Sequence, residues 1–108
     1  MTLSLLMILL ASLSAQAQTA NVGTLRVQSN LAGDITLVWY PSTNVNVTGY
    51  TLYRGPGILN YQEFVPLGNV TKTVVTGLVQ GSTTHFAVTA SNEFGESDFS
   101  NDLAYTAP

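Results

Sequence analysis

Alternation of apolar and polar side chains with a period of two is the feature that most constrains how this chain can fold. The pattern is clearest over Asp34–Tyr40 and over Thr84–Ser91. Successive side chains of an extended strand point to opposite faces. The residues that the alternation places on the inward faces of these runs are Ile35, Leu37, Trp39, Phe86, Val88 and Ala90. Beyond Ala20 no long stretch repeats apolar positions at helical spacing, so the sequence predicts an all-β domain.

Five further strands are predicted between turn signals rich in glycine, proline, asparagine and serine. They are expected at Thr24–Ser29, Val47–Arg54, Glu63–Leu67, Thr71–Thr76 and Asn101–Thr106. Their predicted inward residues are Leu25, Val27, Tyr50, Leu52, Phe64, Val75, Leu103 and Tyr105. Leu78 is expected to pack beneath a turn. Seven strands with one apolar face each can close two antiparallel sheets over a single core, which we expect to centre on Trp39.

The composition fits one folded domain and argues against several classes of partner. The chain has 108 residues, of which 45% are hydrophobic and 8% are charged, a balance that can fill a core. Its three cations, Arg26, Arg54 and Lys72, are spread along the chain, so we expect no nucleic-acid binding. Cysteine is absent, which excludes disulfides and thiolate metal sites.

The N-terminus is typical of a secretory signal. Residues 3–13 read LSLLMILLASL, and small residues follow at Ala15 and Ala17 in the A-x-A pattern that precedes cleavage. A helix over this stretch would reach about 16 Å, against about 30 Å for a bilayer core, so no stable membrane span is expected. We therefore predict a cleaved signal over 1–17, a short linker over 18–22 and a domain over 23–107. The alternative is a retained apolar helix.

Four motifs together resemble a fibronectin type III domain over about residues 21–107. They are Trp39 at the end of a strand just before Pro41, GYTLYRG at Gly49–Gly55, the Leu78 to Ala90 run with its Phe-x-Val-x-Ala ending, and NEFGESDFSN at Asn92–Asn101. The last is similar to bacterial and phage members. The resemblance implies a seven-stranded immunoglobulin-like β-sandwich. Gln80 and Thr84 depart from the pattern, because the family commonly has proline at the first position and a corner tyrosine at the second.

Residues suited to catalysis or metal binding are sparse. His85 is the single histidine, and alternation places it on the solvent face of its strand. Glu93, Glu96 and Asp98 form an acidic group that we interpret as a solvated loop, since the residues lack the order of a strong calcium loop. No nucleophile elbow or phosphate-binding loop is present. We therefore expect no catalytic residue, no metal and no cofactor.

The function that these patterns favour is a non-enzymatic binding or spacer module that is secreted or surface-displayed, with an extracellular or periplasmic location. Its expected partner is a protein or a glycan, contacted through the loop that contains Glu93, Phe94 and Glu96. Exposed aromatic residues could add to such a surface, although ordinary cross-strand pairing also accounts for them; they are Tyr40, Tyr53, Tyr61, Phe94 and Phe99. The alternative is a self-assembling structural subunit of a virion or fibre. Asn46 and Asn69 begin formal glycosylation sequons.

Overall fold

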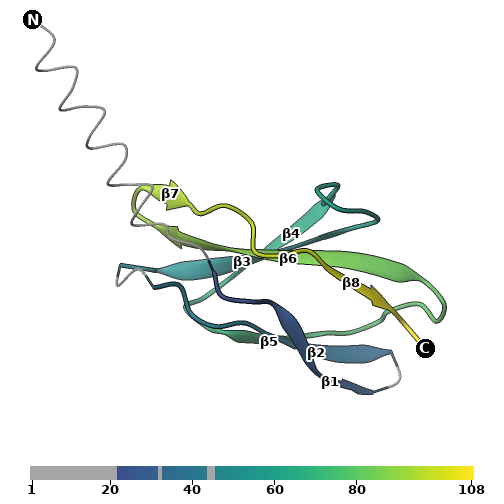
Figure 1. Ribbon diagram of the computed structural model, residues 1–108. Helices are drawn as coiled ribbons and strands as arrows, with labels where there is room; N and C mark the ends of the chain where they lie inside the picture. Colours follow the sequence, from purple (N-terminus) through teal and green to yellow (C-terminus); the bar gives the residue numbers. More distant parts are fainter. Residues whose placement is uncertain (1–21, 32, 44–45) are drawn as a thin grey trace, which may run out of the picture.

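Two antiparallel sheets make up the computed structural model, which describes residues 22–31, 33–43 and 46–108 (Figure 1). The strands are β1 (Arg26–Leu31), β2 (Asp34–Val38), β3 (Gly49–Gly55), β4 (Glu63–Leu67), β5 (Lys72–Val75), β6 (Thr83–Asn92), β7 (Gly95–Glu96) and β8 (Leu103–Thr106). One sheet has the order β1-β2-β5. The other has the order β4-β3-β6-β7, and β8 also pairs with β6. The predicted all-β sandwich is confirmed.

The three-stranded sheet is built on β2. Ile35 lies opposite Val75 of β5 and Asn30 of β1, and the β1–β2 register shifts between Val27 and Ser29. β2 ends at Val38, two residues before the predicted end at Tyr40. The Trp39 backbone N–H still donates to the Thr71 carbonyl oxygen at 3.1 Å, so pairing with the β5 side continues one residue further.

The five-stranded sheet contains the one large difference in strand number. The sequence predicted a single last strand, whereas the structure has two strands after β6. β7 pairs with the C-terminal end of β6, and β8 pairs with its N-terminal end. Between them Ser97 and Ser100 keep the chain attached to β6: their backbone N–H groups donate to the carbonyl oxygens of Ala90 and Val88, both at 2.8 Å. The residues expected as a turn at 92–97 therefore include a short strand, and the predicted count of seven is one too low.

The core lies between the sheets and is filled by the inward residues of both. Its buried members are Val22, Leu25, Ile35, Leu37, Trp39, Tyr50, Leu52, Val75, Phe86, Val88 and Ala90. The Trp39 side chain is 2% exposed, and its ring centroid lies 5.7 Å from that of Tyr50. Leu78 is partly buried and packs against this cluster. Val22, which the sequence analysis assigned to the linker, is buried with it. Burying one such side chain stabilises the fold by about 1.5–3 kcal/mol.

The corner before β6, where fibronectin type III domains commonly have a tyrosine and this chain has Thr84, is closed by other hydrogen bonds. The Leu78 N–H donates to the Gly33 carbonyl oxygen at 3.1 Å, and the Gly81 N–H donates to that of Ala107 at 2.8 Å. The Ser82 hydroxyl donates to the Val79 carbonyl oxygen at 2.6 Å. Backbone pairing and a serine thus hold the corner without a tyrosine at position 84.

The prediction that Phe64 faces inward is wrong. The β3–β4 register places Phe64 opposite Tyr53 and places Val65 opposite Leu52. Since Leu52 is a core residue, Phe64 shares the outer face with Tyr53, and it is 64% exposed. Positions 64 and 65 are both apolar, so alternation does not decide between the two faces, and a shift of one residue reverses every side chain of a strand.

Candidate binding surface

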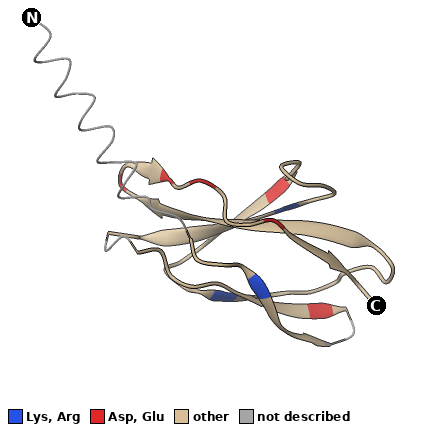
Figure 2. Cartoon of the chain, viewed as in Figure 1, with Lys and Arg blue, Asp and Glu red and all other residues tan. Residues whose placement is uncertain are grey.

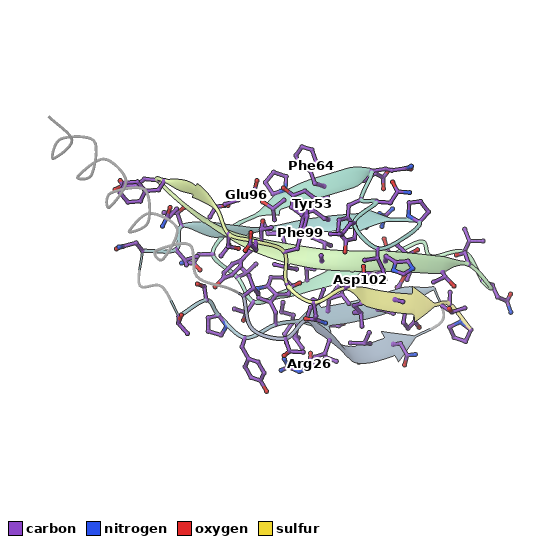
Figure 3. All side chains as sticks on the ribbon, turned by 45° about the horizontal axis from the view of Figure 1, so that its top comes forward. Arg26, Tyr53, Phe64, Glu96, Phe99 and Asp102 are labelled. Atoms are coloured by element: carbon purple, nitrogen blue, oxygen red, sulfur yellow. The ribbon has the colours of Figure 1, made fainter. Side chains whose placement is uncertain are left out.

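Aromatic rings gather on the outer face of the five-stranded sheet. Ala87 and Thr89 belong to that face because they alternate with the core residues of β6, yet they are 0% and 2% exposed. Side chains must therefore cover them. The rings on this face, named here the aromatic cluster, are those of Tyr53, Tyr61, Phe64 and Phe99. Figure 3 shows Phe64, Tyr53 and Phe99 together with Glu96 on this side of the molecule, away from Arg26.

Contacts between the rings are direct. The Phe99 centroid lies 4.9 Å from that of Tyr53 and 5.0 Å from that of Tyr61, both in edge-to-face arrangements. The Phe64 centroid lies 5.8 Å from that of Tyr53. The two edge-to-face contacts of Phe99 are favourable because the positive ring edge meets the negative ring face, by about 0.5–1.5 kcal/mol for each pair. The rings support one another, and Phe64 and Phe99 are still 64% and 40% exposed.

A tight loop between β3 and β4 positions Tyr61. The Asn60 N–H donates to the Gly57 carbonyl oxygen at 3.1 Å, and the Gln62 N–H donates to that of Arg54 at 3.0 Å. The backbone returns so close to β3 that a Cβ at Gly55 would lie 2.0 Å from the Asn60 carbonyl oxygen. Glycine is therefore required at 55 for Tyr61 to reach the cluster.

Phe99 comes from the segment between β7 and β8. The Ser97 and Ser100 hydroxyls accept hydrogen bonds from the backbone N–H groups of Ala90 and Val88, both at 2.9 Å. The next residue, Asn101, accepts from the Leu25 N–H at 2.8 Å and donates to the Leu25 carbonyl oxygen at 3.1 Å. These bonds fix an irregular segment on both sides of Phe99, which holds its ring against Tyr53.

Glu96 is the acidic member of the surface. Its Oε2 accepts hydrogen bonds from the Tyr53 hydroxyl and from the Thr89 hydroxyl, each at 2.6 Å. Burial, the hydrogen bond to Glu96 and the charge of that carboxylate raise the pKa of Tyr53 to about 12. The phenol therefore stays protonated at neutral pH and donates a hydrogen bond to Glu96.

A second carboxylate, Asp102, joins Tyr61 to His85. The Tyr61 hydroxyl donates to Oδ1 at 2.6 Å, and His85 Nδ1 lies 2.7 Å from Oδ2. Burial and the hydrogen bond to Asp102 raise the pKa of Tyr61 to about 12. His85 lies on the predicted outer face, but its side chain is only 17% exposed because this network encloses it.

Charge is divided unequally between the two sheets (Figure 2). The five-stranded sheet and its connections carry five carboxylates and one guanidinium, those of Glu63, Glu93, Glu96, Asp98, Asp102 and Arg54. The three-stranded sheet carries Arg26, Asp34 and Lys72. The formal charges are therefore −4 on the first and +1 on the second. Arg54 is itself paired with Glu63, Nε to Oε1 at 2.9 Å.

The structure separates the three residues of the predicted contact loop. Glu96 lies in β7 and reaches the aromatic cluster through Tyr53. Glu93 and Phe94 lie in the β6–β7 turn, where the Phe94 N–H donates to the Asn92 side chain at 2.8 Å and the ring is 56% exposed. Sequence reasoning placed Phe64 in the core. The sequence predicted Tyr53, Tyr61 and Phe99 as exposed aromatic residues, but nothing in it indicated that their rings lie together.

The described residues contain no group of three or more histidine, cysteine or acidic side chains that could hold a metal ion. All regular secondary structure of the described residues is β, and these residues contain no helix long and apolar enough to cross a membrane. A groove of about 610 Å³ runs between β4 and β5, with Leu52, Val65, Leu67 and Val75 in its lining.

Comparisons with known proteins reveal the fold. No protein-family profile and no curated protein matches the chain. Among solved structures, a fibronectin type III domain derived from the human KIAA0970 protein has a TM-score of 0.70 at 15% identity and covers 89% of this chain and 79% of its own. The third fibronectin III domain of the human KIAA0343 protein has a TM-score of 0.64 at 22% identity, with 81% and 80% covered.

A longer structure, the twitchin kinase region from C. elegans, has a TM-score of 0.69 at 20% identity and covers 83% of this chain. The match spans only 17% of that twitchin fragment. At these identities the likeness concerns the backbone arrangement alone. The chain has a fibronectin type III fold.

Proposed function

We propose that this protein is a non-enzymatic binding module that contacts another macromolecule through the outer face of its five-stranded sheet. The surface consists of the aromatic cluster and the carboxylate of Glu96. A fibronectin type III fold commonly serves as a binding or spacer module, which supports this class of function without naming the partner.

The observation that carries the proposal is the exposure of the rings. Phe64 and Phe99 are 64% and 40% exposed, although each touches Tyr53. Aromatic side chains bury a large area and lose few rotamers on binding, so contacts made by such rings are strong. Their packing also fixes the rings in advance, which lowers the entropy lost on association.

Cross-strand pairing alone does not account for the cluster. It explains Tyr53 with Phe64, which lie opposite each other on β3 and β4. It does not explain Tyr61, which comes from a loop, or Phe99, which comes from the segment between β7 and β8. Two separate connections thus add the rings of Tyr61 and Phe99 to the cross-strand pair of Tyr53 and Phe64.

Export from the cytoplasm is part of the proposal. The support comes from the sequence, where the apolar run of residues 3–13 precedes Ala15 and Ala17. This segment lies outside the described residues. A module of this kind would then meet its partner outside the cell or in a periplasmic space.

Site-specific cross-linking tests the proposed function. A photoreactive benzoylphenylalanine replaces Phe64 in one variant and Tyr40 in another, which is similarly exposed, at 58%, and follows β2 of the other sheet. Cross-linked in its native environment, the position 64 variant is expected to give a discrete adduct that the position 40 variant does not give. Equal labelling from both positions, or none, contradicts the proposal. An adduct of twice the protein's own mass favours the structural subunit, and the recovered mass also shows whether the chain begins at Gln18.

A further inference from the structure

We infer that the occupant of this surface is a cationic side chain, an arginine or a lysine, displayed by a partner protein. The inference rests on the proposed function and specifies its partner. Three features of the described residues carry it: the hydrogen-bonding character of the surface, the exposure of its rings, and the distribution of charge.

The polar atoms of the surface are acceptors. The hydroxyl protons of Tyr53 and Thr89 are committed to Glu96, and that of Tyr61 is committed to Asp102. Both hydrogen bonds that the described residues donate to Glu96 end on Oε2. No described residue donates to its Oε1, so this oxygen can accept from an outside donor, and Glu96 is exposed. A surface that offers acceptors and holds its donors internally selects a ligand that is rich in N–H groups.

The rings add a second attraction for the same ligand. The face of an aromatic ring is negative, and a guanidinium or an ammonium within about 6 Å of its centroid is attracted by about 0.5–2 kcal/mol. Phe64 is the most exposed ring of the cluster and packs on Tyr53, whose hydroxyl is bonded to Glu96. The protein already makes this interaction on its other sheet, where Arg26 Cζ lies 4.2 Å from the ring centroid of Tyr40.

The wider field favours the same occupant. The sheet that carries the cluster has a formal charge of −4, and its one cation, Arg54, is paired with Glu63. A positively charged partner is therefore attracted to this side before contact is made. The hydroxyls of a neutral glycan can donate to the same carboxylates, but a glycan gains nothing from the long-range attraction. Its hydroxyl oxygens would also find few donors, since His85 is 17% exposed and already bonded to Asp102. The structure thus favours a basic protein segment over a sugar.

Titration of the full-length isotope-labelled protein, followed by NMR, tests the inference. The probes are a capped Gly-Arg-Gly peptide, the same peptide with citrulline in place of arginine, and a neutral β-linked glucose hexasaccharide. Citrulline keeps the shape of arginine and removes the charge. The arginine peptide is expected to shift the signals of Tyr53, Thr89 and Glu96 saturably. The citrulline peptide should bind at least about tenfold more weakly, which corresponds to about 1.4 kcal/mol.

Two carboxylate variants sharpen the result. Glu96→Gln is expected to weaken arginine binding about tenfold, because it removes the charge and keeps a carbonyl for Tyr53 and Thr89. Asp34→Asn makes the same change in net charge in β2 of the three-stranded sheet, away from the aromatic cluster, and should change binding less than about twofold.

Equal affinity for the arginine and citrulline peptides overturns the inference, as does equal weakening by the two variants. Binding of the hexasaccharide at the rings makes the occupant a glycan and likewise overturns it. Absence of shifts with all three probes does so too. If these outcomes accompany a specific cross-link at position 64, the proposed function stands and only the cationic partner is rejected.

Discussion

At the scale of single residues, two tyrosines on one sheet face are each tied to a carboxylate. Tyr53 donates to Glu96 and Tyr61 donates to Asp102, both at 2.6 Å. Burial and the neighbouring negative charge both disfavour the phenolate, so the pKa of each tyrosine rises from 10.0 to about 12. The carboxylates in turn are held in place by hydroxyls that do not ionise at neutral pH. This arrangement makes the surface a fixed set of acceptors.

Alkaline titration tests this arrangement. Phenolate absorbance is expected to show Tyr53 and Tyr61 ionising near pH 12 in the folded protein. Because both folded pKa values lie above the unfolded value of about 10, the folded state binds more protons, and stability falls as pH rises from about 10 to about 12. Glu96→Gln should lower the pKa of Tyr53 part of the way, since burial remains, and should leave Tyr61 unchanged. Ionisation of every tyrosine near pH 10 in the folded state would contradict the two hydrogen bonds.

At the scale of elements, the irregular segment between β7 and β8 links the two sheets. Asn101 bonds both backbone groups of Leu25, whose side chain is buried at 1% exposure. Leu25 precedes β1, the first strand of the other sheet. The Asn101 side-chain amide therefore makes the two hydrogen bonds to the Leu25 backbone that a paired strand would otherwise make. The same segment holds Phe99 against Tyr53, so this connection supports both the fold and the surface.

Asn101→Ala is expected to destabilise the fold by about 2 kcal/mol, because it leaves the Leu25 N–H and carbonyl without their partner. Equilibrium unfolding in urea measures the change. Asn69→Ala serves as the matched control. In the described part of the chain the Asn69 side chain makes one hydrogen bond, exposed, to the Val47 carbonyl oxygen at 3.1 Å, so its loss should cost less than about 1 kcal/mol. Equal effects of the two substitutions would show that Asn101 does not link the sheets.

Elements with clear alternation were predictable, and those without it were not. Over residues 34–40 and β6 the largest apolar side chains recur at every second position, so the alternation predicted that Trp39 and Phe86 face inward, and both are buried. In β4 two apolar residues are adjacent, and the face of Phe64 was decided by pairing with Tyr53, which local sequence does not encode. The cluster likewise depends on how two connections lie over β3. Such lateral neighbours are set by register and loop geometry, for which periodicity carries no signal.

At the scale of the whole molecule, one chain makes an apolar interior and an exposed aromatic surface on opposite faces of the same sheet. Leu52 and Tyr53 are adjacent in β3, and the first is 5% exposed in the core while the second joins the outer rings. The interior accounts for stability, and the outer face, with a formal charge of −4 around it, is left for association. The division predicts that substitutions in the two places have separable effects.

Parallel measurement of stability and binding in two variants tests this claim most directly. Trp39→Ala, in the core, is expected to lower the free energy of unfolding by about 3–5 kcal/mol. Phe64→Ala, on the surface, should lower it by about 1 kcal/mol or less and weaken binding of the arginine peptide at least about fivefold. A loss of more than about 2 kcal/mol in Phe64→Ala with unchanged binding would make the cluster a structural feature of the sheet and contradict the account.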